Sequence, residues 1–428
     1  MTSLIIVIFF AFFALCSMKV ALALGLATAL GVAFFSPFDT VIIVQRIVSG
    51  IDSYNLLAIP LFMLAGRLMN EGGITERIFK LCKVFVGRVK GSLAYVNVLS
   101  SIVFSTMSGS AIADIGGLGQ IEIKAMNDEG YPIDFTCAVS VTSCTVGPIT
   151  PPSISLVIYA SIAEVSVGAL FLAGILPGIL MTTSLMVMVF IMGFFIPYPV
   201  TKERFTLKEK IRTIGEALLP LGTPIIIMGG IMGGIFTPTE ASSVAAIYAF
   251  ILGFFIYRNF KLKDLPKILL EVVASTSIVT FIIGCSAAFS WIMVVDHVAQ
   301  RLMDFILILT DSKVMILLFL NIIMLLLGSF MENGTLLILL TPIFLPIAKQ
   351  MGVDPVHFGL IMCLNLILGV ATPPVGTALF LVSNIAQIEI RKIIKMVMIF
   401  IIPLIVVLML VTYVPSISLW IPSMFYLK

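Results

Sequence analysis

The sequence predicts an all-α polytopic membrane protein, and its composition is the first observation that supports this fold class. Of the 428 residues, 60% are hydrophobic and only 11% are charged, and the mean hydropathy is +1.19. A soluble domain carries roughly 25% charged residues, and 25 basic plus 22 acidic side chains cannot form a water-facing shell on a chain of this length. A soluble enzyme is therefore excluded, and the net charge of +3 does not indicate nucleic-acid binding.

Ten long apolar segments are the second observation. The first apolar stretch covers residues 4–35, and as one helix it would measure about 48 Å against a hydrocarbon core of ~30 Å, so we expect it to break near Lys19. No basic region precedes it, so we expect no cleavable signal peptide. The predicted spans are 4–17, 20–35, 54–70, 133–161, 165–196, 217–236, 239–257, 274–295, 355–385 and 389–414.

Two further apolar stretches, at 91–130 and 312–352, are interrupted in the middle by small and polar residues. The interruptions are Ser105–Ser110 and Gly328–Thr335. We predict two re-entrant helical hairpins, each of which enters and leaves the membrane on one side. With a periplasmic N-terminus, this arrangement places 20 of the 25 basic residues on the cytoplasmic side, as the positive-inside rule requires.

Two amphipathic segments, 74–89 and 262–273, are predicted to lie at the membrane surface, because basic and apolar residues alternate in them with helical spacing. The six cysteines stand singly in apolar runs, without metal-ligand spacing, and are expected to serve in packing.

The third observation is an internal repeat. A shift of 222 residues places Gly147–Pro152 on Gly369–Pro374 and Gly130 on Gly352. The repeats are predicted as 1–200 and 217–428, joined by a basic cytoplasmic linker at 201–216. Five crossings in each repeat force the second copy into the opposite orientation, and inverted repeats of this kind are typical of secondary transporters.

Thr-Pro-Pro inside an apolar span breaks the helix, because proline removes an amide donor and clashes with the preceding turn. The sequence therefore predicts two broken transmembrane helices, at 133–161 and 355–385. Unpaired carbonyls at membrane depth need a polar recipient, and a cation such as Na⁺ could bind them together with the hydroxyls of Thr150 or Thr372. Helix N-termini after each break could hold a substrate carboxylate.

Five ionisable residues are assigned either to ion or proton coupling or to a structural role. Asp114 and Glu332 are the acidic residues nearest the hairpin tips, and an intramembrane carboxyl suggests ion or proton coupling. Glu240 is explained by a helix capping box that begins at Thr237. His297 and His357 lie near predicted loops and are expected to be structural.

The second hairpin and the regions that follow it resemble a known family. Asn333–Thr335 leading into Leu340–Pro346, then Gly352–Gly359 and Gly369–Gly376, is similar to the large membrane subunit of tripartite ATP-independent periplasmic (TRAP) transporters. The resemblance extends over essentially the whole chain. It implies an elevator-type fold with a scaffold and a transport domain, Na⁺-coupled uptake of an organic acid across the bacterial inner membrane, and no catalysis. The overall sequence is most similar to the branch of the family that transports sialic acid, and uptake of a C4-dicarboxylate is the alternative.

The resemblance also implies partners and site residues. The partners are a small four-helix membrane subunit, as a separate chain, and a soluble periplasmic substrate-binding protein. No cofactor other than the coupling Na⁺ is expected. The first Na⁺ site is assigned to Ser105, Ser108, Gly109, Ser110, Gly147, Thr150 and Pro151. The second is assigned to Gly328, Ser329, Asn333, Thr335, Gly369 and Thr372. The substrate carboxylate is placed near Ser108, Thr145, Ser153, Asn333 and Thr377.

Three alternatives remain beside the tripartite importer. An autonomous Na⁺/carboxylate symporter of the same superfold would need no binding protein. An intramembrane hydrolase would use Ser108 or Ser110 with a histidine base, but neither histidine lies in a hairpin or a Thr-Pro-Pro segment. A channel is disfavoured because inverted repeats with two hairpins suit alternating closure better than an open pore.

Overall fold

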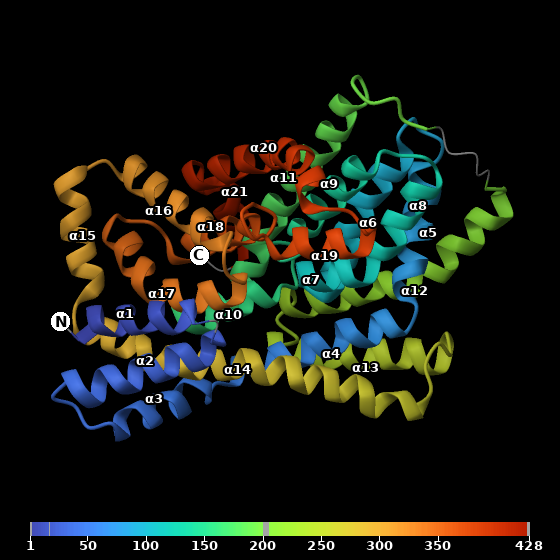
Figure 1. Ribbon diagram of the computed structural model, residues 1–428. Coiled ribbons are helices and arrows are strands. Elements are labelled where there is room, and N and C mark those ends of the chain that lie inside the picture. Colours follow the sequence, from blue (N-terminus) through green and yellow to red (C-terminus); the bar gives the residue numbers. More distant parts are fainter. Residues whose placement is uncertain (1, 17, 200–204, 426–428) are drawn as a thin grey trace.

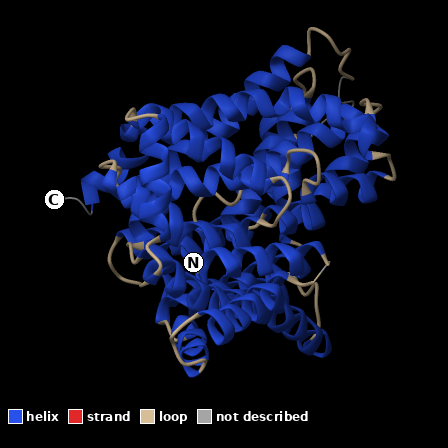
Figure 2. Ribbon diagram, turned by 60° about the vertical axis from the view of Figure 1, so that its left-hand side comes forward, coloured by secondary structure: helices blue, strands red, loops and turns tan. Residues whose placement is uncertain are grey.

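A computed structural model describes residues 2–16, 18–199 and 205–425, and these residues form helices and loops with no strand (Figure 2). Among them, five helices are long and apolar enough to cross a membrane, or six if the bent pair Val41–Ile51 and Tyr54–Glu71 is one span. The all-α polytopic class is thereby confirmed. Five of the six cysteines are buried, as expected for packing residues, whereas Cys16 is exposed.

One layer of the molecule, the lower one in Figure 1, is formed by seven helices and is called the arm layer here. The long helix α14 runs through it and packs against α2, α3 and α4. The helices are α1 (Thr2–Leu15), α2 (Val20–Phe35), α3 (Val41–Ile51), α4 (Ala58–Glu71), α12 (Leu207–Met232), α13 (Pro238–Ile251) and α14 (Leu265–Val295).

The second layer contains both hairpins and both broken helices. Hairpin 1 consists of α6 (Ser92–Ser108), α7 (Ala111–Asp114), the π-helical turn η2 (Ile115–Gly119) and α8 (Gln120–Asp128). Hairpin 2 consists of α16 (Lys313–Gly328) and α17 (Asn333–Gln350). The remaining helices are α5 (Ile74–Val86), α9 (Ile133–Ser143), α10 (Ile154–Ala163), α11 (Val167–Met192), α15 (Val298–Leu309), α18 (Pro355–Val370), α19 (Thr377–Ala386), α20 (Ile390–Tyr413) and α21 (Pro415–Phe425).

The broken helices form where the sequence predicts them. α9 continues through the 3₁₀ turn η3 (Cys144–Val146), breaks at 147–153 and resumes as α10, whereas α18 breaks at 371–376 and resumes as α19. The hydroxyl of Thr150 donates to the Val146 carbonyl at 3.0 Å, and that of Thr372 donates to the Leu368 carbonyl at 2.7 Å. These four residues are related in pairs by the shift of 222, so the two breaks have the same local structure.

A buried polar contact also recurs between hairpin and broken helix. In the first half, Ser143 of α9 donates to Asn97 Oδ1 of α6 at 2.8 Å. In the second half, Asn365 of α18 donates to Asn321 Oδ1 of α16 at 2.9 Å. Ser143 and Asn365 are again 222 residues apart, so each hairpin is joined to its own broken helix by an equivalent hydrogen bond.

Two expected boundaries differ from the structure. The segment 262–273, expected as a separate surface helix, is continuous with the following span in α14, because no proline or glycine interrupts it after Pro266. Within the expected linker 201–216, residues 201–204 lie outside the described residues, and α12 already begins at Leu207, where Thr206 and Glu209 form a capping box. The expected capping box of Thr237 and Glu240 is confirmed at the start of α13.

Replacement of Asn365 by leucine should destabilise the protein, because the substitution leaves the Asn321 side chain buried without its donor. We expect a loss of about 1–2 kcal/mol, seen as a lower thermal unfolding midpoint of the purified protein in detergent. The same substitution at Asn384, which is exposed, serves as the control. An unchanged midpoint for Asn365→Leu would show that this hydrogen bond does not stabilise the second half.

Candidate substrate and cation site

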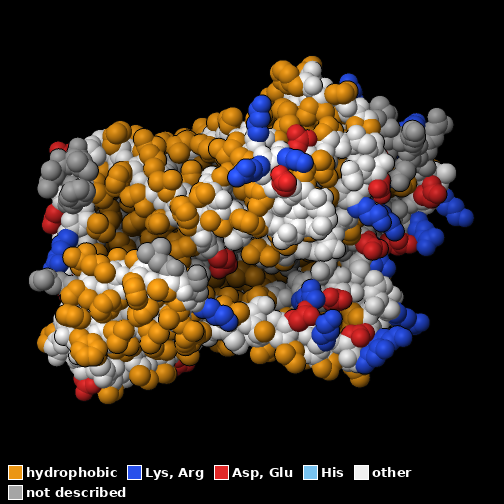
Figure 3. All heavy atoms as spheres, viewed as in Figure 1, with side chains coloured by type: hydrophobic (Ala, Val, Ile, Leu, Met, Phe, Trp, Pro, Cys, Tyr) orange, Lys and Arg blue, Asp and Glu red, His pale blue; other side chains and the backbone are white. Residues whose placement is uncertain are grey.

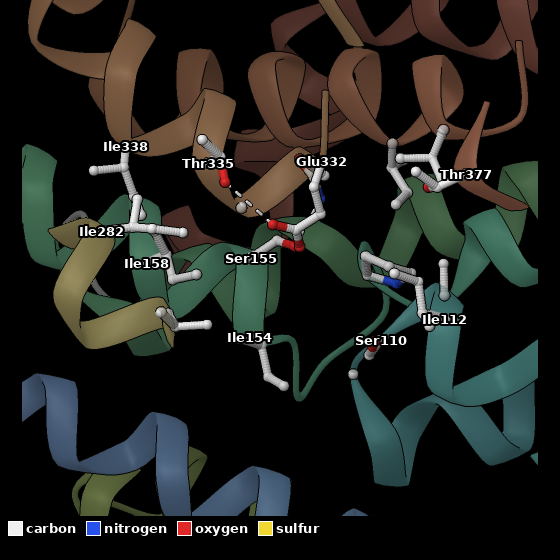
Figure 4. A pocket seen from close by; sticks show the side chains of 18 of the residues that line it. Ser110, Ile112, Ile154, Ser155, Ile158, Ile282, Glu332, Thr335, Ile338 and Thr377 are labelled. Carbon is white, nitrogen blue, oxygen red and sulfur yellow. Dashed lines mark hydrogen bonds between the residues drawn. The ribbon is translucent and has the colours of Figure 1, made fainter. Parts of the chain in front are cut away.

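A cavity of about 110 Å³ lies where both hairpins meet both broken helices, and we call it the central cavity (Figure 4). The first residues of three helices line it: Ile154 and Ser155 of α10, Asn333 and Thr335 of α17, and Thr377 of α19. Each of these N-termini presents unpaired backbone N–H groups and a partial positive charge. Their convergence creates an environment that favours an anion.

The polar side chains of the central cavity come from both halves of the chain. Asn333 donates from Nδ2 to the Ser155 hydroxyl at 2.9 Å, which joins hairpin 2 to the first broken helix. Asn333 Oδ1 and Thr377 Oγ1 are buried and have no hydrogen-bond partner among the described residues. Thr335 donates to Glu332 at 3.3 Å, and Figure 4 shows the Glu332 carboxyl beside Ser155. The cavity therefore offers both donors and acceptors to a ligand.

Two larger cavities adjoin the central one between the layers, where Figure 3 shows the surface hollowed. The Arg67 cavity, about 340 Å³, is lined by Arg67 and shares Met63 and Ser110 with the central cavity. The Glu164 cavity, about 610 Å³, shares Ile338 with it. The three cavities thus form a series, with the smallest in the middle.

One face of α14 borders all three cavities. Six of its lining residues recur at intervals of three or four, which places them on one side of the helix: Glu271, Ser275, Val279, Ile282, Ser286 and Ser290. The polar members of this row lie towards its two ends, where the apolar Val272, Ile283 and Ala287 also line the outer cavities, and its middle, Val279 and Ile282, is apolar. The arm layer therefore supplies a wall whose apolar part faces the hairpin tips.

Comparison with known proteins identifies the family. Residues 6–417 match the family described as "Tripartite ATP-independent periplasmic transporter, DctM component". The chain belongs to this family of TRAP transporter large permeases. It is 44% identical to the sialic acid TRAP transporter large permease protein SiaM of Vibrio cholerae, over 89% of each chain. It is 37% identical to the C4-dicarboxylate TRAP transporter large permease protein DctM of Pseudomonas aeruginosa, over 94% of each chain.

Two more relatives extend the comparison. The permease is 40% identical to the sialic acid TRAP transporter permease protein SiaT of Haemophilus influenzae, over 89% of its own length and 62% of that protein. The crystal structure of the YdaH transporter of Alcanivorax borkumensis has the same fold, with a TM-score of 0.62 at 14% identity over 89% and 87% of the two chains. These relatives are transporters, so the permease is a membrane transport protein and not an enzyme.

At the predicted first Na⁺ site, the structure brings the hairpin 1 tip against the first break. Gly109 has φ +60°, and a Cβ there would lie 2.9 Å from the Pro152 carbonyl oxygen, so only glycine allows this approach. Ser110 lines the central cavity, while Ser108 lines the Arg67 cavity with a buried hydroxyl that has no partner among the described residues. The Ser105 side chain lies outside the described residues.

Two of the other residues assigned to the first half of the chain donate hydrogen bonds within their own segment. Thr145 donates to the Thr142 carbonyl at 2.7 Å, and Ser153 donates to the Pro148 carbonyl while capping α10. Gly147, Thr150 and Pro151 are buried in the break. None of these five residues lines the three cavities, and the Gly147 carbonyl accepts a hydrogen bond from the Thr150 amide at 3.1 Å.

The predicted second Na⁺ site shows the same close approach. Gly328 of hairpin 2 and Gly369 of the second broken helix are packed backbone to backbone, since a Cβ on Gly369 would lie 2.5 Å from Gly328 Cα. The Ser329 carbonyl accepts a hydrogen bond from the Gly376 amide at 3.0 Å, and its hydroxyl donates to the Leu326 carbonyl at 2.7 Å. Of the six residues assigned here, Asn333 and Thr335 reach the central cavity.

Sequence reasoning missed two buried polar residues. Ser155 is the counterpart of Thr377 at the shift of 222, so the repeat itself could have indicated it in place of Ser153. Glu122 of α8 is fully buried and accepts a hydrogen bond from Ser100 at 2.6 Å.

Asp114, which the sequence suggested as a coupling residue, is also buried in hairpin 1 and does not line the central cavity, whereas Glu332 does. His357 contacts Ser418 at 2.6 Å, away from the cavities.

Proposed function

We propose that the permease is the Na⁺-coupled membrane subunit of a TRAP importer for an organic acid, with sialic acid (N-acetylneuraminate) as the favoured substrate. The observation that carries this proposal is the convergence of the α10, α17 and α19 N-termini on one cavity. Such a cavity favours a carboxylate. Sialic acid is favoured because two of the similar relatives, at 44% and 40% identity, are named for it, while a C4-dicarboxylate relative at 37% identity keeps that acid as the second candidate.

Na⁺ coupling is supported by the two sites of close backbone approach. Each hairpin tip meets a broken helix whose carbonyls have lost their helical partners, and hard cations prefer such oxygens. Glu332 gives a second reason, because a carboxylate that lines the substrate cavity repels an acid unless a cation compensates its charge. Two bound Na⁺ ions beside the cavity would supply that compensation.

Movement of one layer past the other is the transport step that we propose. The arm layer would stay fixed in the membrane, and the layer with both hairpins would carry the site along the α14 face, from the Glu164 cavity towards the Arg67 cavity. The small hydrophobic middle of that face, Val279 and Ile282, would separate the two aqueous sides. This is the elevator type of alternating access.

The distribution of charge supports the orientation that we propose for the permease. Figure 3 shows Lys and Arg side chains gathered towards the right-hand end of the molecule, where α5, α8 and α12 lie, and the N-terminus lies at the opposite end (Figure 1). Under the positive-inside rule the basic end is cytoplasmic, and the N-terminus is periplasmic. The substrate would then be received from a periplasmic binding protein, with a separate small membrane subunit bound to the permease.

Reconstitution into proteoliposomes tests the proposal. The permease, its small subunit and the binding protein should accumulate labelled N-acetylneuraminate when Na⁺ is imposed outside, and not when K⁺ replaces it. A tenfold Na⁺ gradient contributes about 1.4 kcal/mol per ion, so two ions support up to about 100-fold accumulation. Equal uptake in K⁺ would contradict Na⁺ coupling, uptake of succinate alone would assign the dicarboxylate, and uptake without the binding protein would favour the autonomous symporter.

A further inference from the structure

Arg67 is the one basic side chain, among the described residues, that lines any of the three cavities along α14. It lies in the last turns of α4, in the arm layer, and its cavity opens beside the central cavity through Met63 and Ser110. An acid that leaves the central cavity on this side therefore meets one guanidinium, with the carboxyl of Glu271 lining the same cavity.

The guanidinium is only partly engaged by protein groups. Arg67 Nη2 lies 2.5 Å from Glu271 Oε2 of α14 and 3.1 Å from Glu71 Oε1 of its own helix. Arg67 Nε is buried and has no hydrogen-bond partner among the described residues. A guanidinium has five N–H donors in a planar fork that fits a carboxylate, and both glutamates use the same nitrogen.

We propose that Arg67 is a second carboxylate-binding site of the permease, fixed in the arm layer, which receives the substrate carboxylate on its way to the cytoplasm, with Glu271 as the internal competitor. The inference rests on the proposed transport of an organic acid. Glu271 occupies the guanidinium while no substrate is present, so the incoming carboxylate replaces one anion by another. The competition keeps the affinity low, and the acid can leave.

A purely structural role is the alternative, because the Arg67–Glu271 pair also joins α4 to α14. The two roles predict different outcomes for the two halves of the pair. If the pair only joins the helices, Arg67→Gln and Glu271→Gln break the same bond and have the same effect. If Arg67 binds substrate, Glu271→Gln removes its competitor and strengthens binding, whereas Arg67→Gln removes the site.

The test is exchange of labelled N-acetylneuraminate in proteoliposomes that hold the complete transporter, with the acid varied inside or outside. Glu271→Gln should lower the half-saturation constant for internal acid about fivefold, and Arg67→Gln should raise it about tenfold, as expected for one charged hydrogen-bonded contact. The constant for external acid should stay within about twofold of wild type in both variants, because the arm-layer site faces one side.

Arg67→Lys keeps the charge but loses the planar fork, so it should give an intermediate constant. Arg77→Gln is the matched control, since Arg77 lies over the Tyr257 ring and does not line any of the three cavities. The proposal would be overturned if Arg67→Gln and Glu271→Gln changed the half-saturation constant for internal acid in the same direction, or if neither changed it. Failure of wild type to take up any acid would contradict the proposed function instead, and thermal unfolding of each variant identifies one that does not fold.

Discussion

Alanine at Gly369 should lower Na⁺-driven uptake about 50-fold, because the added Cβ would lie 2.4–2.8 Å from three backbone atoms of Gly328. Backbone atoms cannot rotate away as a side chain can, so hairpin 2 and the second broken helix must separate. Overpacking of this kind costs typically 1–3 kcal/mol, and a loss near 2.3 kcal/mol at the cation site corresponds to about 50-fold. The initial rate of uptake into proteoliposomes, at several Na⁺ concentrations, measures the effect.

Gly229→Ala is the matched control for this substitution. Gly229 lies in α12, and a Cβ there would meet no atom within 4 Å. Uptake by the Gly229→Ala variant should stay within about twofold of wild type, since alanine is also a better helix former than glycine. Wild-type Na⁺ dependence in Gly369→Ala would show that the close approach of the two glycines is not part of a cation site.

Alanine at Asn333 should lower uptake about tenfold, mainly through a higher half-saturation constant for the substrate. The substitution removes the hydrogen bond to Ser155, which joins the two halves of the cavity, and it removes a buried amide oxygen that has no partner among the described residues. A ligand that uses this amide loses one contact and meets a less ordered site, which is worth about 1.4 kcal/mol.

Asn333→Asp separates a role in charge from a role in shape. It preserves size but adds a negative charge beside Glu332, so an acid should bind still more weakly than in Asn333→Ala. Asn384→Ala, at an exposed position, should leave uptake unchanged. If Asn333→Ala takes up substrate with wild-type kinetics, the substrate does not contact this part of the central cavity.

The sequence was sufficient to predict the hairpins and the broken helices, because proline, glycine and short polar interruptions act locally. Gly369–Pro374 must break a helix wherever the segment lies, and the shift of 222 reveals the second break. The capping box at Thr237 and Glu240 is equally local, and it formed as expected.

The side-chain roles were harder to predict because they depend on tertiary contacts. Thr145 has a hydroxyl of the kind that binds ligands, yet this hydroxyl donates a hydrogen bond to the Thr142 carbonyl at 2.7 Å. Nothing in the local sequence distinguishes Ser155 from other helix residues. Asn333 contacts it only because hairpin 2 packs against α10. Glu122 lies on the buried side of α8, whose other side is exposed, and it accepts a hydrogen bond there from Ser100 of α6.

The most direct test of the central claim is a cryo-electron microscopy map of the permease with its small subunit, recorded in Na⁺ with N-acetylneuraminate. The proposal predicts density for the carboxylate in the central cavity, within hydrogen-bond distance of Ser155 or Asn333, and a cation at each approach of hairpin tip to broken helix. Substrate density outside the region between the two hairpin tips, with both breaks empty at saturating Na⁺, would contradict it.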